Sequence, residues 1–200
     1  MALDKPFSQA CENNRAPILA VIKPLFAECR AVLEIGSGTG QHAVYFAAEL
    51  PHLQWLTSDR EEGHAGIRAW IDEARLPNLR PPLSLDVQQQ SWPELEVDAV
   101  FSANTAHIMS WPMVEAFFAG VAALLPGGGA FVLYGPFNYA NRYTSDSNAA
   151  FDRRLKARDP LSGIRNFEDL QRLAGAGGMS FVRDYAMPAN NRILYWQKDV

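Results

Sequence analysis

The chain has 200 residues, of which 48% are hydrophobic and 20% are charged. This length and this composition are typical of a single globular domain with a sizeable core. The formal net charge of -4 argues against a broad basic face that would neutralise a phosphate backbone. Nucleic acid is therefore not the expected partner, and a small-molecule substrate is.

The amino terminus and the cysteines indicate where the protein resides. The opening sequence MALDKP lacks the apolar core of a signal peptide, and no window approaches the roughly 18 apolar residues of a membrane span. Cys11 and Cys29 are the only cysteines, and neither belongs to a C-x-x-C motif. They are expected to be two ordinary thiols of a reducing compartment rather than a disulfide or a metal site. We therefore expect a cytoplasmic protein without membrane contact, either a monomer or a homodimer.

Strands and helices are predicted to alternate along the chain. Residues 5–17 are polar and expected to be irregular, and a helix that starts at Ile18 should end near Lys23 because Pro24 follows. The predicted strands are residues 31–35, 53–59, 83–86, 98–104, 130–134, 180–186 and 192–198. One further helix is predicted to start at residue 41, and four others to span residues 66–75, 114–125, 150–157 and 167–174. The last two strands are joined by only four residues, so they should pair antiparallel.

This alternation predicts an α/β fold with a mostly parallel sheet covered by helices on both faces. We expect one domain, residues 1–200, with an N-terminal cap segment at residues 1–17. Residues 135–165 are rich in Tyr, Asn, Ser and Thr. A long segment of this kind in a compact domain is usually functional, so we predict a lid or substrate insertion there.

One stretch carries a cofactor signature. The sequence EIGSGTG runs from Glu34 to Gly40, directly after the apolar run of the first strand and before a helical pattern. Its glycines are Gly36, Gly38 and Gly40. Such a turn brings bare backbone and a helix N-terminus against whatever binds there. The stretch therefore predicts a nucleotide-type cofactor site.

Polar residues follow the next three strands. Asp59 ends the second strand, nineteen residues after Gly40, and Asp86 and Asn104 end the third and the fourth. The carboxyl ends of the strands are where ligands bind in open α/β sheets. Asp59 is placed to accept hydrogen bonds from both hydroxyls of a ribose.

This ordered set resembles the class I, Rossmann-like methyltransferases that depend on S-adenosyl-L-methionine. The resemblance covers nearly the whole chain and implies a seven-stranded sheet that ends in an antiparallel pair. It implies that the glycine turn lines the cofactor, Glu34 orders the turn, Asp59 holds the ribose and Asp86 with Val87 lies at the adenine. The full set of residues implied to bind the cofactor is Asn14, Arg15, Glu34, Gly36, Ser37, Gly38, Gly40, Asp59, Arg60, Asp86, Val87 and Asn104.

More narrowly, the chain looks like a methyltransferase-like family catalogued as a domain of unknown function. The residues that carry this likeness are Glu12, Asn14, Pro17, Asn104, His107 and the stretches YGPFN (134–138), SDSN (145–148) and MPANNR (187–192).

His107 is the candidate general base, because its place just past Asn104 puts it on the loop expected to adjoin the methyl group and its ordinary pKa of about 6.5 suits neutral pH. The alternative for His107 is a helix-capping or core histidine. The candidate substrate-binding residues are Tyr134, Asn138, Asn148 and Asn190. The segment after the fourth strand reads NTAH instead of the N-P-P-Y type that marks methylation of amino groups in nucleobases and glutamine, and no aspartate cluster suggests magnesium. We therefore expect metal-free methyl transfer to an oxygen, nitrogen or sulfur of a small molecule.

Two other functions stay open. Asp59 would suit the ribose of NAD equally well, although the turn is G-x-G-x-G and not the G-x-G-x-x-G of nicotinamide-dependent oxidoreductases. Alternatively, the protein is a catalytically silent cofactor-binding subunit of a larger assembly. Such a subunit should expose an apolar patch with residues such as Trp92, Trp111 or Phe118.

Overall fold

The computed structural model describes residues 5–200. The chain divides into two compact units, with the division between Ser102 and Ala103. The first four residues of the predicted N-terminal cap lie outside the described residues.

The strands form a seven-stranded sheet with the order β3-β2-β1-β4-β5-β9-β8. In the first unit, β1 pairs parallel with β2 and β4, and β2 pairs parallel with β3. In the second unit, β9 pairs antiparallel with both β5 and β8. The strands are β1 (Ala31–Ile35), β2 (Gln54–Asp59), β3 (Leu79–Ser84), β4 (Ala99–Ala103), β5 (Ala130–Gly135), β8 (Met179–Met187) and β9 (Asn191–Lys198). The predicted fold class, a mostly parallel seven-stranded sheet with a C-terminal antiparallel pair, is confirmed.

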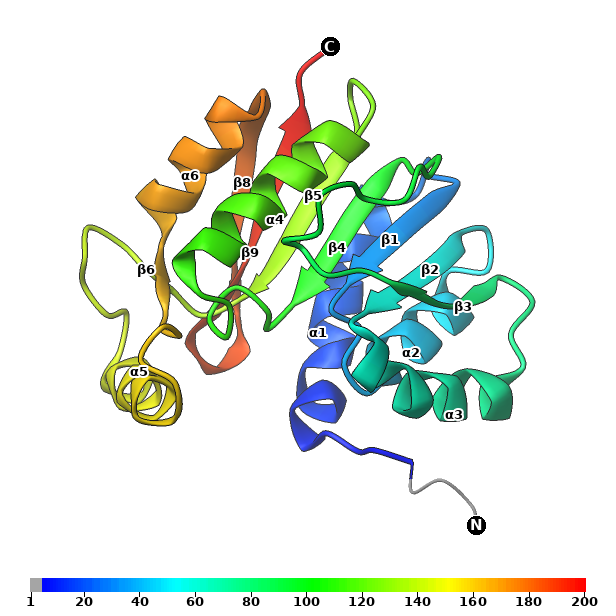
Figure 1. The fold of residues 1–200 in the computed structure, drawn as a ribbon, viewed down its shortest axis with the longest axis horizontal. Helices are drawn as coiled ribbons and strands as arrows, with labels where there is room; N and C mark the ends of the chain where they lie inside the picture. Colours follow the sequence, from blue (N-terminus) through cyan, green and yellow to red (C-terminus); the bar gives the residue numbers. More distant parts are fainter. Residues whose placement is uncertain (1–4) are drawn as a thin grey trace. The chain divides into compact units, whose positions relative to one another are not determined.

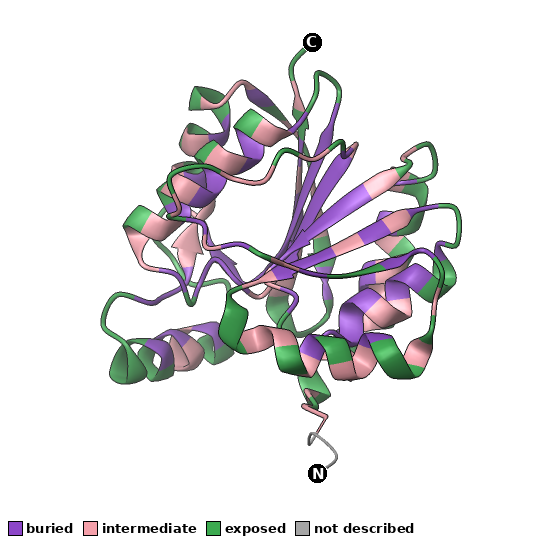
Figure 2. Cartoon of the chain, turned by 45° about the vertical axis from the view of Figure 1, so that its right-hand side comes forward, coloured by how far each residue is buried: buried purple, intermediate pink, exposed green. Residues whose placement is uncertain are grey.

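Three α-helices and one 3₁₀-helix belong to the first unit, where α1 packs against α2 and α2 against α3 (Figure 1). They are α1 (Gln9–Leu25), α2 (Gln41–Glu49), η1 (Glu61–Gly63) and α3 (His64–Ala74). The strands of this unit are mostly buried, and the exposed residues gather on the outer faces of the helices (Figure 2). The rings of Phe46, Trp55 and Phe101 pack with centroids 5.4–5.9 Å apart and form its aromatic core.

The first helix corrects the sequence prediction. Helix α1 starts at Gln9, so most of the segment expected to be irregular is helical. The Oγ of Ser8 accepts the backbone N–H of Cys11 at 3.4 Å, which caps the helix and fixes its start. The helix also runs past Pro24 and ends at Leu25, because a proline in the last turn removes only one of the final hydrogen bonds.

The third strand starts four residues earlier than predicted, at Leu79, and contains Pro81 and Pro82. In the described part of the chain it lies at the edge of the sheet and pairs only with β2. Proline is tolerated on an edge strand because an edge residue can leave its N–H side unpaired. Asp86 therefore follows β3 in a turn instead of ending the strand.

The second unit contains α4 (Trp111–Leu124), α5 (Asp146–Arg158), α6 (Phe167–Ala176) and η2 (Pro188–Asn190). Helices α4 and α6 lie side by side (Figure 1). Phe118, Phe131 and Trp196 form the aromatic core of this unit, with ring centroids 5.2–5.6 Å apart. A short parallel pair, β6 (Phe137–Asn138) with β7 (Arg165–Asn166), brackets α5 and was not predicted. Within residues 5–200, no helix is long and apolar enough to cross a membrane.

Candidate functional site

The glycine turn between β1 and α2 has a conformation that other residues rarely adopt. The φ angles of Gly36, Gly38 and Gly40 are +73°, +58° and +89°. The N–H groups of Gly36 and Ser37 donate to the carbonyl of Ser58 at 3.0 and 2.9 Å, which ties the turn to the end of β2. A Cβ on Gly40 would lie 3.1 Å from the backbone Cα of Ile67 in α3. Glycine is therefore required at position 40 both by φ and by the close approach of a helix.

Glu34 lies beneath this turn and holds it from the core. Its Oε2 accepts hydrogen bonds from Ser37 Oγ at 2.9 Å and from the Trp55 indole N–H at 3.2 Å. The side chain is buried, and burial raises its pKa from the usual 4.5 to about 7. Glu34 thus contacts the turn directly, and the ordering role implied for it stays a prediction.

Asp59 holds the outer side of the same turn. Its Oδ2 accepts the Gly38 N–H at 2.8 Å, and its Oδ1 accepts the Arg60 N–H at 2.8 Å. Among residues 5–200, and apart from Gly38 and its two chain neighbours, no atom lies within 4 Å of the position that a Cβ on Gly38 would take. An oriented carboxylate therefore stands beside bare backbone that faces open space.

The end of β3 lies next to Asp59, because the Leu85 N–H donates to the Asp59 carbonyl at 3.0 Å. In the following turn, Asp86 Oδ1 accepts the Gln88 N–H at 2.9 Å, which orients that carboxylate. Val87 is buried. The structure thus brings Asp86 and Val87 to the same strand ends as Asp59, while Arg60 is exposed and pairs with Glu62 at 3.5 Å.

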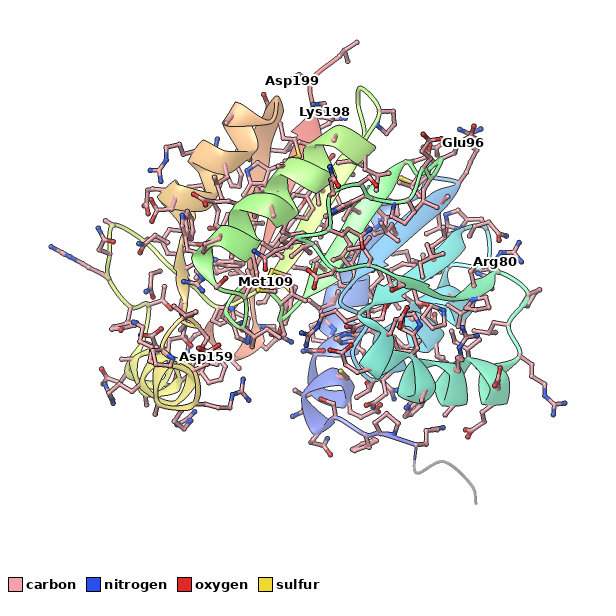
Figure 3. All side chains as sticks on the ribbon, viewed as in Figure 1. Arg80, Glu96, Met109, Asp159, Lys198 and Asp199 are labelled. Carbon is pink, nitrogen blue, oxygen red and sulfur yellow. The ribbon has the colours of Figure 1, made fainter. Side chains whose placement is uncertain are left out.

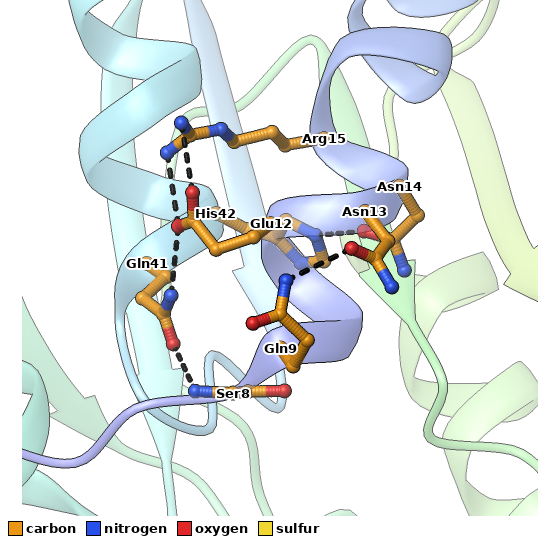
Figure 4. Close-up of polar contacts among 8 residues, drawn as sticks. All are labelled: Ser8, Gln9, Glu12, Asn13, Asn14, Arg15, Gln41 and His42. Atoms are coloured by element: carbon orange, nitrogen blue, oxygen red, sulfur yellow. Dashed lines mark hydrogen bonds and ion pairs between the residues drawn. The ribbon is translucent and has the colours of Figure 1, made fainter.

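The start of α1 is bound to the glycine turn through Gln41, the first residue of α2 (Figure 4). Gln41 Oε1 accepts the Ser8 N–H at 2.5 Å and the Thr39 hydroxyl at 3.1 Å. Gln41 Nε2 donates to Glu12 Oε1 at 2.9 Å. Sequence reasoning missed Gln41, because nothing in its local sequence distinguishes it from an ordinary first residue of a helix.

Asn14 and Arg15 belong to the same polar cluster (Figure 4). Asn14 is buried, and His42 Nε2 lies 2.6 Å from its Oδ1, so that nitrogen carries the proton and donates it. Burial lowers the pKa of His42 to about 4, with a smaller contribution from Arg15. Arg15 pairs with Glu12 at 2.8 Å. Both residues belong to α1, where Asn14 contacts His42 near the start of α2, and their part in cofactor binding stays a prediction.

Residues 5–8 extend this cluster onto α3. The Trp70 indole N–H donates to the Pro6 carbonyl at 2.7 Å, and the Lys5 ammonium lies 3.6 Å from the centroid of the Trp70 ring. The Pro6 ring fills the place beside Gly66, where a Cβ would come within 2.6 Å of Pro6 Cγ. The N-terminal segment is therefore fastened to both helices that follow the glycine turn and β2.

His107 is in the second unit, buried beside the end of β5. Its ring packs edge-on against the ring of Phe151, with the centroids 5.2 Å apart. Its Nδ1 lies 3.9 Å from the position that a Cβ on Gly135 would take. Burial lowers the pKa of His107 to about 4, assisted by Arg165 and Arg158. The imidazole is thus neutral at physiological pH, and its pKa is lower than the ordinary value expected from the sequence.

The loop that carries His107 is held by its backbone. The His107 carbonyl accepts the Gly163 N–H at 2.8 Å. Arg165 donates to the carbonyls of Ala106 and Met109 on either side of it. Met109 lies at the foot of α4 (Figure 3).

Asp152 in turn fixes the segment that contains Gly163. Its side chain is 1% exposed and accepts three hydrogen bonds, from Tyr143 Oη at 2.7 Å, from Lys156 Nζ at 2.6 Å and from the Ile164 N–H at 2.7 Å. Burial alone would raise the pKa of Asp152, but these hydrogen bonds outweigh it and hold the pKa below its usual value. Sequence reasoning missed Asp152, because only Lys156 lies in the same helix, and Tyr143 and Ile164 reach it from the loops on either side of α5.

The four candidate substrate residues differ in their surroundings. Asn148 Nδ2 donates to the Asn190 carbonyl at 3.1 Å, so these two residues join α5 to the turn before β9. Tyr134 is buried, and its carbonyl accepts the N–H of Asn104, which has a left-handed φ of +61°. Asn138 is buried in β6. The role of all four in substrate binding, and of Asn104 in cofactor binding, stays a prediction.

A family model described as "Protein of unknown function (DUF938)" matches residues 5–198. The chain belongs to the DUF938 family. This result agrees with the narrower likeness seen in the sequence motifs.

Solved structures of other proteins share the fold of this DUF938 chain. An O-methyltransferase family protein from Burkholderia thailandensis matches with a TM-score of 0.82 and 15% identity, over 92% of this chain and 56% of that one. The S-adenosylmethionine-dependent methyltransferase SibL in its apo form matches with a TM-score of 0.80 and 23% identity, over 95% and 56% of the two chains. PigF with SAH matches with a TM-score of 0.80 and 16% identity, over 94% and 56%. The DUF938 chain thus spans about half the length of the structures that it matches, and it shares the fold of the part that is matched.

The three residues named for the apolar patch of a silent subunit are not exposed in the DUF938 chain. Phe118 is buried in the core, and Trp92 and Trp111 are half-buried. The Trp92 indole N–H donates to the Val87 carbonyl at 3.3 Å, and that of Trp111 to Glu115 Oε1 at 2.8 Å. Within the same residues, no three His, Cys, Asp or Glu side chains are grouped to hold a metal ion, and metal-free chemistry stays a prediction.

Proposed function

We propose that the protein transfers a methyl group from S-adenosyl-L-methionine to a small-molecule acceptor. The observation that carries this proposal is the hydrogen bond of the Gly38 N–H to the Asp59 carboxylate at 2.8 Å, beside open space at Gly38. This hydrogen bond places the exposed backbone of the turn beside the acid that we propose binds the ribose. The names of the structural neighbours, an O-methyltransferase family protein and an S-adenosylmethionine-dependent methyltransferase, support the same activity.

The residues of the first unit fit this cofactor. Gly38 carries no side chain that would keep a ligand from the backbone of the turn, and the Asp59 carboxylate has lone pairs left to accept ribose hydroxyls. Asp86 and Val87 offer one polar and one apolar group for an adenine ring. Glu34 keeps the turn in shape from below.

When bound, the cofactor supplies a methyl group to the acceptor's nucleophile and leaves as a neutral thioether, so the protein mainly has to align the nucleophile with the carbon and the sulfur. Alignment of this kind can lower a barrier by about 7–11 kcal/mol. If the nucleophile carries a proton, the proton must leave as the bond forms, and we propose that neutral His107 accepts it. A conjugate acid with a pKa of about 4 makes His107 a weak base that is always unprotonated at neutral pH.

Removal of the Asp59 carboxylate should weaken binding of S-adenosylmethionine. For Asp59→Ala we expect a loss of about 1–3 kcal/mol in binding free energy, the range of hydrogen bonds to a charged group. Calorimetric titration of the folded variant measures this loss. Asp72→Ala is the control, because Asp72 is an exposed acid of α3. Unchanged affinity in Asp59→Ala would remove Asp59 from the site.

Replacement of the buried histidine should separate binding from turnover. We expect His107→Ala to keep the affinity for S-adenosylhomocysteine and to lose methyl transfer, while His52→Ala keeps both. Because the pKa of His107 is about 4, protonation of this residue should not reduce the wild-type rate between about pH 8 and pH 5.5. Wild-type rates in His107→Ala would eliminate it as the base.

The acceptor is to be found by a transfer assay. Protein incubated with pooled metabolites and cofactor labelled in its methyl group should move the label into a small molecule. The Asp59→Ala protein should do so more slowly at limiting cofactor. If the label moves into no metabolite although the cofactor binds, the silent-subunit alternative is correct and the catalytic proposal is wrong.

A further inference from the structure

Gln41, the first residue of α2, contacts three segments that meet at the glycine turn (Figure 4). Its Oε1 accepts the Ser8 N–H at 2.5 Å and the Thr39 hydroxyl at 3.1 Å, and its Nε2 donates to Glu12 Oε1 at 2.9 Å. The side chain is 2% exposed, so bulk solvent does not compete for these partners. A single buried amide therefore joins the turn to the start of α1 and to the residues before it.

The neighbours of Gln41 require both an acceptor and a donor at this position. The Ser8 N–H can only donate, and Glu12 accepts as a carboxylate that pairs with Arg15 at 2.8 Å. These two partners fix which end of the Gln41 amide carries the oxygen. A glutamate at this position would keep the acceptor but face Glu12 with a second carboxylate, and a methionine would lose the whole amide.

Residues 5–8 form a strap that is held from two sides. Trp70 in α3 donates its indole N–H to the Pro6 carbonyl at 2.7 Å, and Gln41 accepts the Ser8 N–H. Phe7 lies between these two contacts and is 62% exposed, so the strap does not bury its largest apolar side chain. A segment with little apolar burial opens at low cost in free energy. Docking of the strap therefore depends strongly on Trp70 and Gln41.

Both of these residues also lie against the glycine turn. Gln41 accepts the hydroxyl of Thr39, which belongs to the turn. The Cβ of Trp70 lies 3.4 Å from the position that a Cβ on Gly40 would take. The same two side chains thus contact the strap on one side and the end of the turn on the other.

Three consecutive residues of the turn are each held by a side chain from outside it. The pairs are Ser37 with Glu34, Gly38 with Asp59 and Thr39 with Gln41. Backbone that is rich in glycine has many accessible conformations, so each contact that fixes the turn before a ligand arrives lowers the entropy cost of binding. Gln41 supplies one of these contacts and also holds the strap.

We propose that Gln41 is a positioning residue for the cofactor turn, and that it couples docking of the strap to the affinity for the cofactor. The coupling rests on the proposed function, because it concerns the same site. Linkage is reciprocal, so a bound cofactor should favour the docked strap by the same factor as the docked strap favours cofactor binding.

Calorimetric titration with S-adenosylhomocysteine measures the part played by Gln41. Gln41→Glu should weaken binding about tenfold, because a second carboxylate then faces Glu12. In a Glu12→Gln background the same change should cost no more than about threefold, since the donor is then at position 12 and the acceptor at position 41. The control is Gln9→Glu, an exposed change in α1, which should bind as the wild type does. Equal losses in the two backgrounds would overturn the positioning role.

Hydrogen exchange of the backbone amides follows the strap itself. Trp70→Phe removes the N–H that holds Pro6 and keeps the Cβ against Gly40. Without ligand, this variant should exchange the Ser8 N–H faster than the wild type, and it should bind S-adenosylhomocysteine about threefold more weakly. In the wild type, S-adenosylhomocysteine should slow exchange of the Ser8 N–H, and in Gln41→Met it should not.

The outcomes separate the coupling from the proposed function. Wild-type affinity in both Gln41→Met and Trp70→Phe, together with faster exchange of the Ser8 N–H, would overturn the coupling and leave the proposed function intact. A wild-type protein that does not bind S-adenosylhomocysteine would refute the proposed function and the coupling with it. If Gln41→Met does not fold, Trp70→Phe decides, because it changes a half-buried side chain outside the turn.

Discussion

Asp152→Ala should lower the free energy of unfolding by about 3 kcal/mol, the order of magnitude for losing hydrogen bonds to a buried charge. The carboxylate joins α5 to the segment before β7 through the Ile164 N–H, which the variant leaves buried without its partner. The loss of Lys156 as a partner matters less, because that side chain is 54% exposed and regains water. The same variant should loosen the backbone that holds His107, since Gly163 lies next to Ile164.

Chemical denaturation at neutral pH measures this change, with the exposed Arg153→Ala of the same helix as the control. Because the pKa of Asp152 is held below its usual value, its contribution is present above that value and is lost as the pH falls through the pKa of the folded state. The difference between wild type and Asp152→Ala should therefore shrink in acid. A destabilisation below about 1 kcal/mol at pH 7 would show that the three hydrogen bonds do not stabilise the fold.

Glu34→Gln should change how stability depends on pH. The folded protein raises the pKa of Glu34 to about 7 from a usual 4.5, so the proton is held more tightly in the folded state. The stabilisation from this proton is complete below about pH 4.5, declines as the pH rises and is lost once the pH passes 7. From the size of this pKa shift, the free energy of unfolding of the wild type should fall by about 3 kcal/mol relative to that of Glu34→Gln over this pH range.

Urea denaturation from pH 4.5 to pH 8.5 tests this dependence. The glutamine side chain keeps an oxygen that can accept hydrogen bonds from Ser37 and Trp55. The free energy of unfolding of the variant should therefore equal that of the wild type in acid and exceed it at alkaline pH. Glu49→Gln, an exposed change in α2, should track the wild type throughout. Parallel curves for wild type and Glu34→Gln would mean that Glu34 is ionised in the folded state at all these pH values.

The central strands were predicted well because buried parallel strands have an uninterrupted apolar pattern. Strand β1 spans Ala31–Ile35 as predicted, and the C-terminal pair is antiparallel because its link is too short for a crossover. Strand β3 was misplaced because a proline interrupts a strand only where the sheet needs a backbone N–H at that position. A residue on an edge strand can do without that N–H. The start of helix α1 was predicted too late, at Ile18 instead of Gln9, because a capping serine and a polar first turn look the same in sequence as an irregular segment.

Within the candidate site, the sequence identified residues and the structure supplied their interactions. The turn and Asp59 were predicted from their positions after strands, a rule that holds for open α/β sheets generally. The contact of Gln41 with Ser8 joins segments 33 residues apart, so no local pattern reveals it. The low pKa of His107 likewise depends on burial and on Arg165, 58 positions away in the sequence.

The central claim, that the turn from Gly36 to Gly40 with Asp59 binds S-adenosylmethionine, is tested most directly by calorimetric titration of the intact chain. The titrants are S-adenosylhomocysteine and, in a parallel experiment, NAD. We expect one saturable site for S-adenosylhomocysteine, weakened by Asp59→Ala, and no binding of NAD. Binding of NAD alone would contradict the account and assign the turn to a nicotinamide cofactor.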